Sequence, residues 1–396
     1  AQRNPQPPQP NPRFPQTAVV PNDLAMWQPR LGLTWKPRSS DRGVLRLSSG
    51  IFTARTPATI FSRVFHDNGI NVIGLDSNVS RNILTIVPFP GAFTAVPTGV
   101  AGIVPRIFGM ESGFRNPRSF QLSVSWEQEF VRNWSASIGY LRNSTWNLHR
   151  MLDRNLFPPV YDATGLPVFP ATRPDPSIGI LQINESSAHA SYDGLLLSVR
   201  RRMTKRVSLQ SSYTFAVTHD DDSNERDFSR NLVLDPFNLK TQRGYSKQDI
   251  RHNAVISGVV ALPWGVTFSS ILQARSGLPY TAIVGVDLQR DGNIANDRAI
   301  IGGRVVPRNS FRQPAFFNWD TRLLRDFRVS DTARLTLSFE AFNITKASNK
   351  NFGPDQESVY GRGPAPDLNF GIPFEAPSSA RFGGARQVQL GARFTF

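Results

Sequence analysis

Apolar and polar residues alternate along several segments of this chain. In Phe120–Phe130, the even positions carry mostly aromatic and aliphatic side chains, and the odd positions carry Gln, Ser and Glu. The same alternation recurs in Val207–Val217, in Leu335–Ala341 and in the last nine residues. Successive side chains of a β-strand point to opposite faces of a sheet, so this pattern predicts strands with one apolar face.

The alternation predicts an all-β protein, an antiparallel meander of about eleven strands. The expected strands are residues 30–36, 43–54, 119–131, 133–149, 189–202, 205–218, 249–262, 265–282, 312–330, 333–346 and 385–396. No window shows the 3.6-residue period of an amphipathic helix.

The connections between these strands alternate between short and long. The short ones are Pro37–Arg42, Arg132–Asn133, Met203–Lys205, Pro263–Trp264 and Asp331–Thr332, and the long ones are 55–118, 150–188, 219–248, 283–311 and 347–384. In a meander, successive connections lie at opposite ends of the sheet. Loops of this length are uncommon in compact soluble domains. Tight turns at one rim and long loops at the other are typical of outer-membrane β-barrels, with short periplasmic turns and long extracellular loops.

A membrane barrel reverses the usual assignment of the two faces. The apolar face meets lipid, and the face rich in Ser, Thr, Gln and Glu lines a wet lumen. Glu127, Glu129 and Glu340 would be costly in a dry core but not in water. The aromatic residues that suit the interfacial girdles are Trp35, Trp134, Tyr140, Trp264, Trp319 and Phe327, with Trp27, Phe394 and Phe396. A secreted β-sandwich or solenoid, with ordinary sheet packing, is the alternative.

Composition excludes several other classes. The 396 residues include no cysteine, so a disulfide scaffold, a thiolate zinc site and a cysteine nucleophile are ruled out. No run approaches the roughly 18 apolar residues that a transmembrane helix needs. There is no H-E-x-x-H, G-x-S-x-G, phosphate-binding loop or dinucleotide fingerprint, so we do not expect an enzyme.

The net charge of +15 comes from 45 Lys and Arg against 30 Asp and Glu. The basic run Arg200–Arg206 resembles a nucleic-acid-binding patch. It spans a predicted tight turn at the periplasmic rim, where basic side chains can reach lipid phosphates or the lumen. This run is therefore expected to contact outer-membrane lipid, with no nucleic-acid partner. At the extracellular loops, the net positive charge is expected to favour contact with lipopolysaccharide or an anionic solute.

The last predicted strand carries a short pattern of its own. Gln389, Gly391, Phe394 and Phe396 stand in the order polar, x, Gly, x, x, aromatic, x, aromatic. This pattern resembles the C-terminal β-signal that the bacterial barrel-assembly machinery reads. It predicts that machinery as a partner.

Several segments, in order along the chain, carry a resemblance to one family. They are Gln28–Trp35 (similar to PRLGLAW), Tyr192–Arg202 (YNALQVSLRRR), Leu209–Phe215 with Asp220–Ser223 (QASYTWSKSIDDSS), Asp249–His252 with Leu262–Pro263 (DVRHR and LP), Asn318–Asp320 (NWD) and Phe339–Asn343 (FEAFN). Together they resemble TonB-dependent receptors of the Oar-like type, common in Acidobacteria. The resemblance extends over residues 28–396 apart from the variable loops.

The resemblance implies a 22-stranded barrel that follows a signal peptide, a TonB box and a plug. We expect none of these three preceding parts in this chain. Residues 30–396 would be the C-terminal half of the barrel. Residues 1–29, which are rich in Pro, would be the remnant of an extracellular loop. An open sheet leaves two unpaired edges, so we do not expect this part to insert or transport alone.

The function implied by the resemblance is TonB-energised movement of a bulky, scarce solute across the outer membrane, by uptake or by export. TonB would act through the N-terminal part that is not present here. Specificity is expected in loops 55–118 and 347–384, because binding residues concentrate on loops held by a rigid scaffold. The alternatives are a passive porin or surface-adhesion barrel and, outside membranes, a secreted β-rich binding module.

One loop resembles a calcium-binding loop. Its candidate ligands are Asp287, Asp291, Asn293 and Asp297. Gly292 permits a sharp turn between oxygen ligands. Against calcium, the third position is Gln289, Arg290 adds positive charge, and no Glu stands at the twelfth position. Calcium and a self-bonded loop without an ion both stay open, and no other cofactor is expected.

Overall fold

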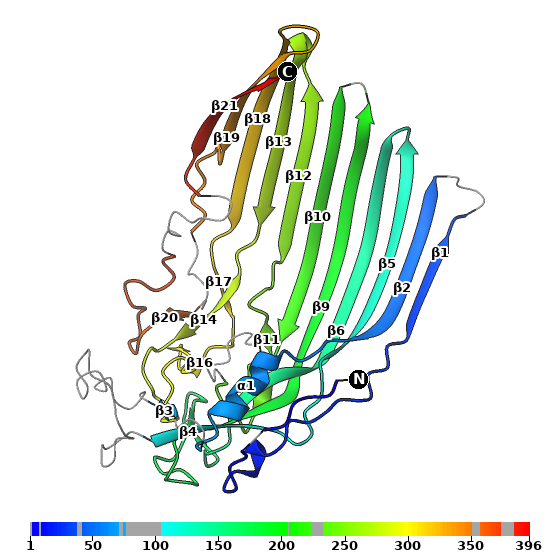
Figure 1. Cartoon of the computed structure of the whole chain (residues 1–396). Helices are drawn as coiled ribbons and strands as arrows, with labels where there is room; N and C mark the ends of the chain where they lie inside the picture. Colours follow the sequence, from blue (N-terminus) through cyan, green and yellow to red (C-terminus); the bar gives the residue numbers. More distant parts are fainter. Residues whose placement is uncertain are drawn as a thin grey trace.

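Eleven antiparallel strands form the wall of one curved sheet in the computed structural model, and three short strands join this sheet at its side (Figure 1). The structure describes residues 2–7, 9–37, 42–70, 74–76, 104–204, 206–222, 233–350, 357–373 and 384–396. In spatial order the strands are β1 (Arg30–Trp35), β2 (Gly43–Thr53), β5 (Arg118–Val131), β6 (Trp134–Asp153), β9 (Leu181–Thr204), β10 (Val207–Asp220), β12 (His252–Ala261), β13 (Val266–Arg275), β18 (Phe316–Arg328), β19 (Arg334–Phe342) and β21 (Gln387–Thr395). This order follows the chain, so the predicted meander is confirmed.

The two ends of the sheet differ as predicted. The tight connections lie at the end that holds the C terminus, and the long connections lie at the opposite end (Figure 1). Asn133 turns the chain between β5 and β6 with a φ of 68°, a left-handed conformation that asparagine tolerates. Residues 38–41 of the predicted turn Pro37–Arg42, and Lys205 of the predicted turn Met203–Lys205, lie outside the described residues.

The strand register gathers apolar side chains on one face of the sheet. One row of directly paired residues runs Trp35, Leu45, Trp126, Ile138, Leu197, Tyr213, Ala254, Ala274 and Phe317. Large side chains of this row are exposed: Trp35 is 53% exposed, Ile138 is 49% exposed and Leu197 is 39% exposed. A large exposed apolar face is rare on monomeric soluble proteins and marks a contact surface for lipid or protein.

The opposite face is polar and carries ion pairs. A neighbouring row of paired residues includes Glu127, Ser137, Ser198 and Ser212. On this face Arg46 binds Glu127 at 2.9 Å and Arg322 binds Glu340 at 3.0 Å. The Glu129 carboxylate instead accepts the backbone N–H of Asn133 at 2.9 Å in the β5–β6 turn.

The predicted strand 265–282 is in fact two strands, which corrects the sequence analysis. β13 ends at Arg275, and the chain then leaves the wall and forms β14 (Pro279–Ile283). At Gly277 a Cβ atom would lie 1.7 Å from the backbone oxygen of Gln313. Only glycine allows this close crossing of two backbones, and the alternating pattern does not register it.

Strands β6 and β9 are longer than predicted and continue past the sheet into the loop end. β6 reaches Asp153 and its last five residues are buried, whereas its middle is half-buried. Register shifts between Thr145 and Arg150 accompany this change, with Asn147 at a φ of 58°. β4 (Val104–Met110) pairs in parallel with the start of β9 and covers the extension.

The structure also contains a helix that the sequence analysis did not predict. α1 (Ala58–His66) buries Ile60, Phe61 and Val64 against Val20, Met110 and Phe114. Its nine residues are too few for the 3.6-residue period to stand out. None of the helices in the described part of the chain is both long and apolar enough to span a bilayer.

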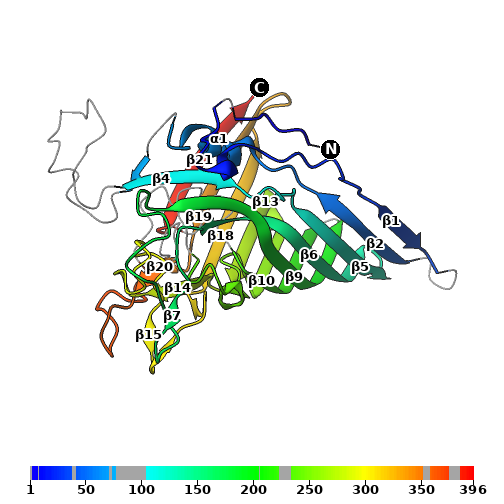
Figure 2. The same ribbon diagram turned by 90° about the horizontal axis from the view of Figure 1, so that it is seen from below.

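The buried core of the described chain lies among the long loops and not between the faces of the sheet. We call this region the loop assembly; it comprises the described residues of 2–29, 54–117, 147–190, 219–251, 276–315 and 343–373. Its remaining elements are β3 (Gly74–Asp76), β7 (Val160–Tyr161), β8 (Pro167–Val168), β11 (Gly244–Tyr245), β15 (Ile300–Ile301), β16 (Arg304–Val305), β17 (Phe311–Arg312), β20 (Glu357–Val359) and the 3₁₀ turns Pro15–Thr17 and Leu239–Gln242, while Pro263–Gly265 forms a 3₁₀ turn at the opposite end. Figure 2 shows the sheet as an open trough, and Figure 1 shows these loops gathered at one end of it.

Candidate functional site

Buried ion pairs hold the loop assembly together. Arg150, at the end of β6, is 1% exposed and binds Asp221 at 2.7 Å, with Asp222 at 3.7 Å. Arg173 binds Asp153 at 2.8 Å. Removing one partner of such a pair leaves a buried charge without compensation, so these pairs fix the loops in one arrangement.

Two further arginines join the loop after β13 to the loop after β10. Arg308 binds the Asp220 carboxylate and donates to the backbone oxygen of Gln242 at 2.7 Å. Arg312 binds the buried Asp249 carboxylate and donates to the backbone oxygen of Gly277 at 3.0 Å. These contacts connect residues far apart in the chain, and no local pattern in the sequence predicts them.

An aromatic cluster joins the loop before β18 to the segment 357–373. Tyr280 and Phe311 lie 5.6 Å apart between ring centroids, and Phe370 lies 5.4 Å from Phe311 and 5.1 Å from Tyr360. β14 pairs with β17 and, in parallel, with β20. Segment 357–373, part of the predicted specificity loop 347–384, is therefore packed onto the assembly.

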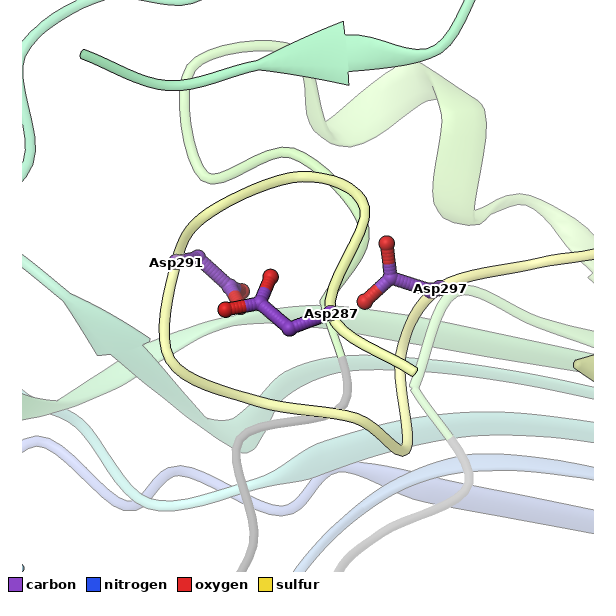
Figure 3. A group of neighbouring side chains, drawn as sticks. All are labelled: Asp287, Asp291 and Asp297. Atoms are coloured by element: carbon purple, nitrogen blue, oxygen red, sulfur yellow. The ribbon is translucent and has the colours of Figure 1, made fainter. Parts of the chain in front are cut away.

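Three carboxylates converge within the assembly. Asp287, Asp291 and Asp297 come from one turn of chain between β14 and β15, and their carboxylates point toward one another (Figure 3). One oxygen from each lies within 4.8 Å of the other two. Asp297 is fully buried, Asp291 is 7% exposed and Asp287 is partly exposed. The sequence analysis chose these three residues, and the fold brings them together.

Backbone N–H groups shape this turn. Asp287 accepts hydrogen bonds from the N–H groups of Arg290 at 2.6 Å and Gly292 at 3.0 Å. Asp297 Oδ1 accepts those of Leu288 at 2.9 Å and Gln289 at 2.8 Å. Gly292 has a φ of 88°, as the predicted sharp turn requires.

The fourth predicted ligand, Asn293, has a different part in the turn. Its N–H donates to Asp291 at 2.8 Å, and its side-chain oxygen accepts the N–H of Ala295 at 3.0 Å. It closes the turn beside the three carboxylates.

The acidic turn binds two other loops. The Gln289 side chain donates to the backbone oxygen of Leu234 at 2.8 Å and to that of Pro167 at 3.3 Å. Asn296 donates to the backbone oxygen of Val233 at 3.1 Å. The turn thus lies where the β6–β9, β10–β12 and β13–β18 loops meet.

Burial changes the acidity of this turn. It raises the pKa of Asp291 to about 8 and the pKa of Asp297 to about 7, and the Asp287 carboxylate adds to both shifts. Neither residue, nor Asp287, forms an ion pair within the described part of the chain. The nearby Arg173 donates to the backbone oxygen of Asp291 at 2.6 Å, but the carboxylate that Arg173 binds is that of Asp153.

Some buried oxygen atoms of the turn have no hydrogen-bond donor among the described residues. They are Asp297 Oδ2, Asn296 Oδ1 and Gln289 Oε1. The Asn296 amide lies beside the cluster, because its Nδ2 donates to Asp291 Oδ2 at 2.5 Å. Buried acceptors are almost always paired, so these three oxygen atoms can each accept a further partner. The sequence analysis missed Gln289 and Asn296 as contributors.

The predicted interfacial aromatics fall into two groups along the strands. Trp35, Trp134, Trp264 and Phe327 lie at the tight-turn end, and Tyr140 and Trp319 lie closer to the loops. Trp319 and Phe327 are eight residues apart on β18, about 27 Å at ~3.4 Å per residue. A strand tilt of about 40° brings this to roughly 20 Å, close to the ~25 Å apolar band of such barrels. The girdle role stays a prediction.

The predicted assembly signal lies on the edge strand β21. Gln389 pairs with Glu340, and Gly391 pairs with Ser338. A Cβ atom at Gly391 would lie 2.6 Å from the Ser338 hydroxyl. Phe394 is 55% exposed and Phe396 is 93% exposed, on the apolar face and at its end. Recognition by the assembly machinery stays a prediction.

The fold, the exposed apolar face and the one-sided loops define the wall of an outer-membrane β-barrel. The chain belongs to the outer membrane beta barrel domain family, whose model matches residues 3–306. It is therefore a protein of the bacterial outer membrane and a barrel protein, not an enzyme. None of the curated proteins matches it in sequence.

Among solved structures, this chain is similar to one transporter and to two receptors. The outer membrane transporter YddB of Escherichia coli superposes with a TM-score of 0.51 at 10% identity, covering 93% of this chain and 39% of YddB. The ferripyoverdine receptor of Pseudomonas aeruginosa gives 0.49 at 10% identity, covering 96% and 34%. The ferric enterobactin receptor of P. aeruginosa gives 0.49 at 11%, covering 93% and 40%. This chain spans about two fifths or less of the length of each.

Proposed function

We propose that this chain forms the C-terminal half of a 22-stranded TonB-dependent receptor of the Oar-like type, which moves a bulky solute across the outer membrane. The observation that carries the proposal is the open wall of eleven strands. Among the described residues β1 pairs only with β2, and β21 pairs only with β19. Lipid does not tolerate two free sheet edges, so further strands must close the barrel.

The number of strands limits how it closes. Because the meander has an odd number of strands, β1 and β21 run in the same direction. A barrel in which every pair is antiparallel needs an odd number of additional strands between these two edges. Eleven more give 22 strands. The 39% share of the YddB chain that this sheet covers supports a wall of that size.

The loop assembly supports a receptor more than an open pore. Long loops at one rim are packed, bridged by buried ion pairs and tied to a hydrophobic cluster with the segment 2–29. A rigid surface at the extracellular rim suits capture of a large solute. In this proposal, TonB acts on a plug supplied by the remainder of the protein.

Heat-modifiable migration in SDS gels tests the half-barrel. We expect the complete protein to show a fast-migrating folded species in detergent, and this chain with an outer-membrane leader to show none. A folded, heat-modifiable species from this chain alone would contradict the proposal.

A second measurement separates the alternative functions. A receptor closed by a plug gives little conductance in a planar bilayer, and a passive porin gives a steady open channel. Recovery from culture supernatant, and not from outer membranes, would indicate a secreted binding module.

A further inference from the structure

The acidic turn between β14 and β15 has the geometry of a cation site. One oxygen from each of Asp287, Asp291 and Asp297 lies within 4.8 Å of the other two. A calcium ion binds oxygen at about 2.3–2.6 Å, so one ion can reach oxygens up to roughly 5 Å apart. The three carboxylates point toward one another (Figure 3), so they can surround a single ion.

A second observation, independent of the cluster, also indicates a ligand. Asp297 is fully buried, and its Oδ2 has no donor within the described part of the chain. Asn296, 3% exposed, has an unpaired Oδ1, while its Nδ2 contacts Asp291. Asn296 is not one of the three carboxylates, so its unpaired oxygen is an observation separate from them, and oxygen is the atom type that a hard cation binds.

The chemistry of the donors selects the ion. The group consists of carboxylates with an amide oxygen beside them, and no described His belongs to it. Oxygen-only sites suit calcium and magnesium, and soft or borderline metals prefer nitrogen or sulfur. Magnesium demands near-ideal octahedral geometry and keeps several waters, whereas calcium accepts irregular sites. An irregular, largely buried turn favours calcium.

We propose that Asp287, Asp291 and Asp297 bind one calcium ion, with the oxygen of Asn296 completing the site from the protein. The ion would neutralise three carboxylates that have no ion-pair partner among the residues that the structure describes. It would also fix the place where the β6–β9, β10–β12 and β13–β18 loops meet, because Gln289 and Asn296 in the same turn bond to the other two loops. Calcium would thus determine whether the loop assembly keeps its packed arrangement.

Direct titration tests the site in the complete protein, purified from outer membranes in detergent and treated with a chelator. Isothermal titration with calcium chloride should show a site that the Asp297→Asn variant weakens at least tenfold. Asn keeps the size of the side chain and one oxygen acceptor. Asp287→Asn, at a partly exposed position, gives the same answer if the buried variant fails to fold.

Asp162→Asn is the matched control. Asp162 lies in the same loop assembly and accepts the N–H groups of Thr164 at 2.8 Å and Leu166 at 2.9 Å, away from the cluster. This variant changes the net charge equally and should bind calcium as the unaltered protein does.

Proteolysis of the loops gives a second readout. Calcium should slow cleavage in the unaltered protein and in Asp162→Asn, and not in Asp287→Asn. Absence of calcium binding up to about 10 mM, well above extracellular calcium sites, would overturn the proposal and leave a self-bonded turn held by protonated carboxyls. Equal binding in all variants, or magnesium binding as tight as calcium, would also overturn it. Binding is read directly, so the result does not depend on the transport proposal.

Discussion

Arg150 shows how single residues fix the loop assembly. Its guanidinium is almost fully buried at the end of β6, beside two carboxylates of the loop that follows β10. A sequence pattern cannot reveal this, because an arginine in an alternating strand is expected to face water. The same holds for Gln289 and Asn296, whose importance comes from the atoms left unpaired around them.

Replacing Arg150 by Met should destabilise the loop assembly by about 3 kcal/mol, because the half-buried carboxylates of Asp221 and Asp222 would lose the Arg150 guanidinium. Thermal unfolding and loop proteolysis of the complete protein measure the effect. Arg13→Met is the control, since Arg13 is 59% exposed and binds Asp175 at 2.9 Å. That change should cost less than about 1 kcal/mol. An equal loss of stability in both variants would show that the buried ion pairs of Arg150 stabilise the protein no more than the exposed pair of Arg13 does.

At the scale of elements, the alternating pattern located all eleven wall strands. It works where one face is apolar and the other polar, which holds only along the wall. Past Asn147 both faces of β6 are buried, so the alternation ends although the strand continues to Asp153. Between β13 and β14 the reverse happens, and the alternation continues although the strand has ended.

The break between β13 and β14 depends on Gly277. Gly277→Ala should displace the β14 backbone, because the new Cβ atom would lie 1.7 Å from the backbone oxygen of Gln313. Overpacking of this kind costs about 1–3 kcal/mol or more. Loop proteolysis and thermal unfolding of the complete protein should both show it. Gly32→Ala, on β1 with nothing within 4 Å of its Cβ position, should leave both measurements unchanged. A silent Gly277→Ala variant would mean that the crossing is looser than the structure shows.

At the scale of the whole molecule, the two faces of the sheet are the reverse of those in a soluble protein, where the apolar face is buried. Its apolar face is exposed, its polar face carries Arg46–Glu127 and Arg322–Glu340 ion pairs, and its buried core lies among the loops. This arrangement is stable only with lipid on one face and water on the other.

A charge placed on each face tests this assignment. Leu197→Arg on β9, paired with Ile138 and Tyr213 on the apolar face, should destabilise the folded protein in lipid by about 2–4 kcal/mol. Ser212→Arg on the polar face should cost little. Folding into lipid vesicles, followed by heat-modifiable migration, measures both. A larger cost for Ser212→Arg would reverse the assignment of the two faces.

The sequence by itself determined the wall: the strand class, the order of the strands, the face of each side chain and the end that holds the loops. These follow from local alternation and connection length, which depend only on neighbours along the chain. The tertiary structure alone decided how the loops pack, which arginines are buried and where three aspartates meet. Those features depend on contacts between residues tens of positions apart, and the free energy of burying a charge is set by the partners that folding brings to it.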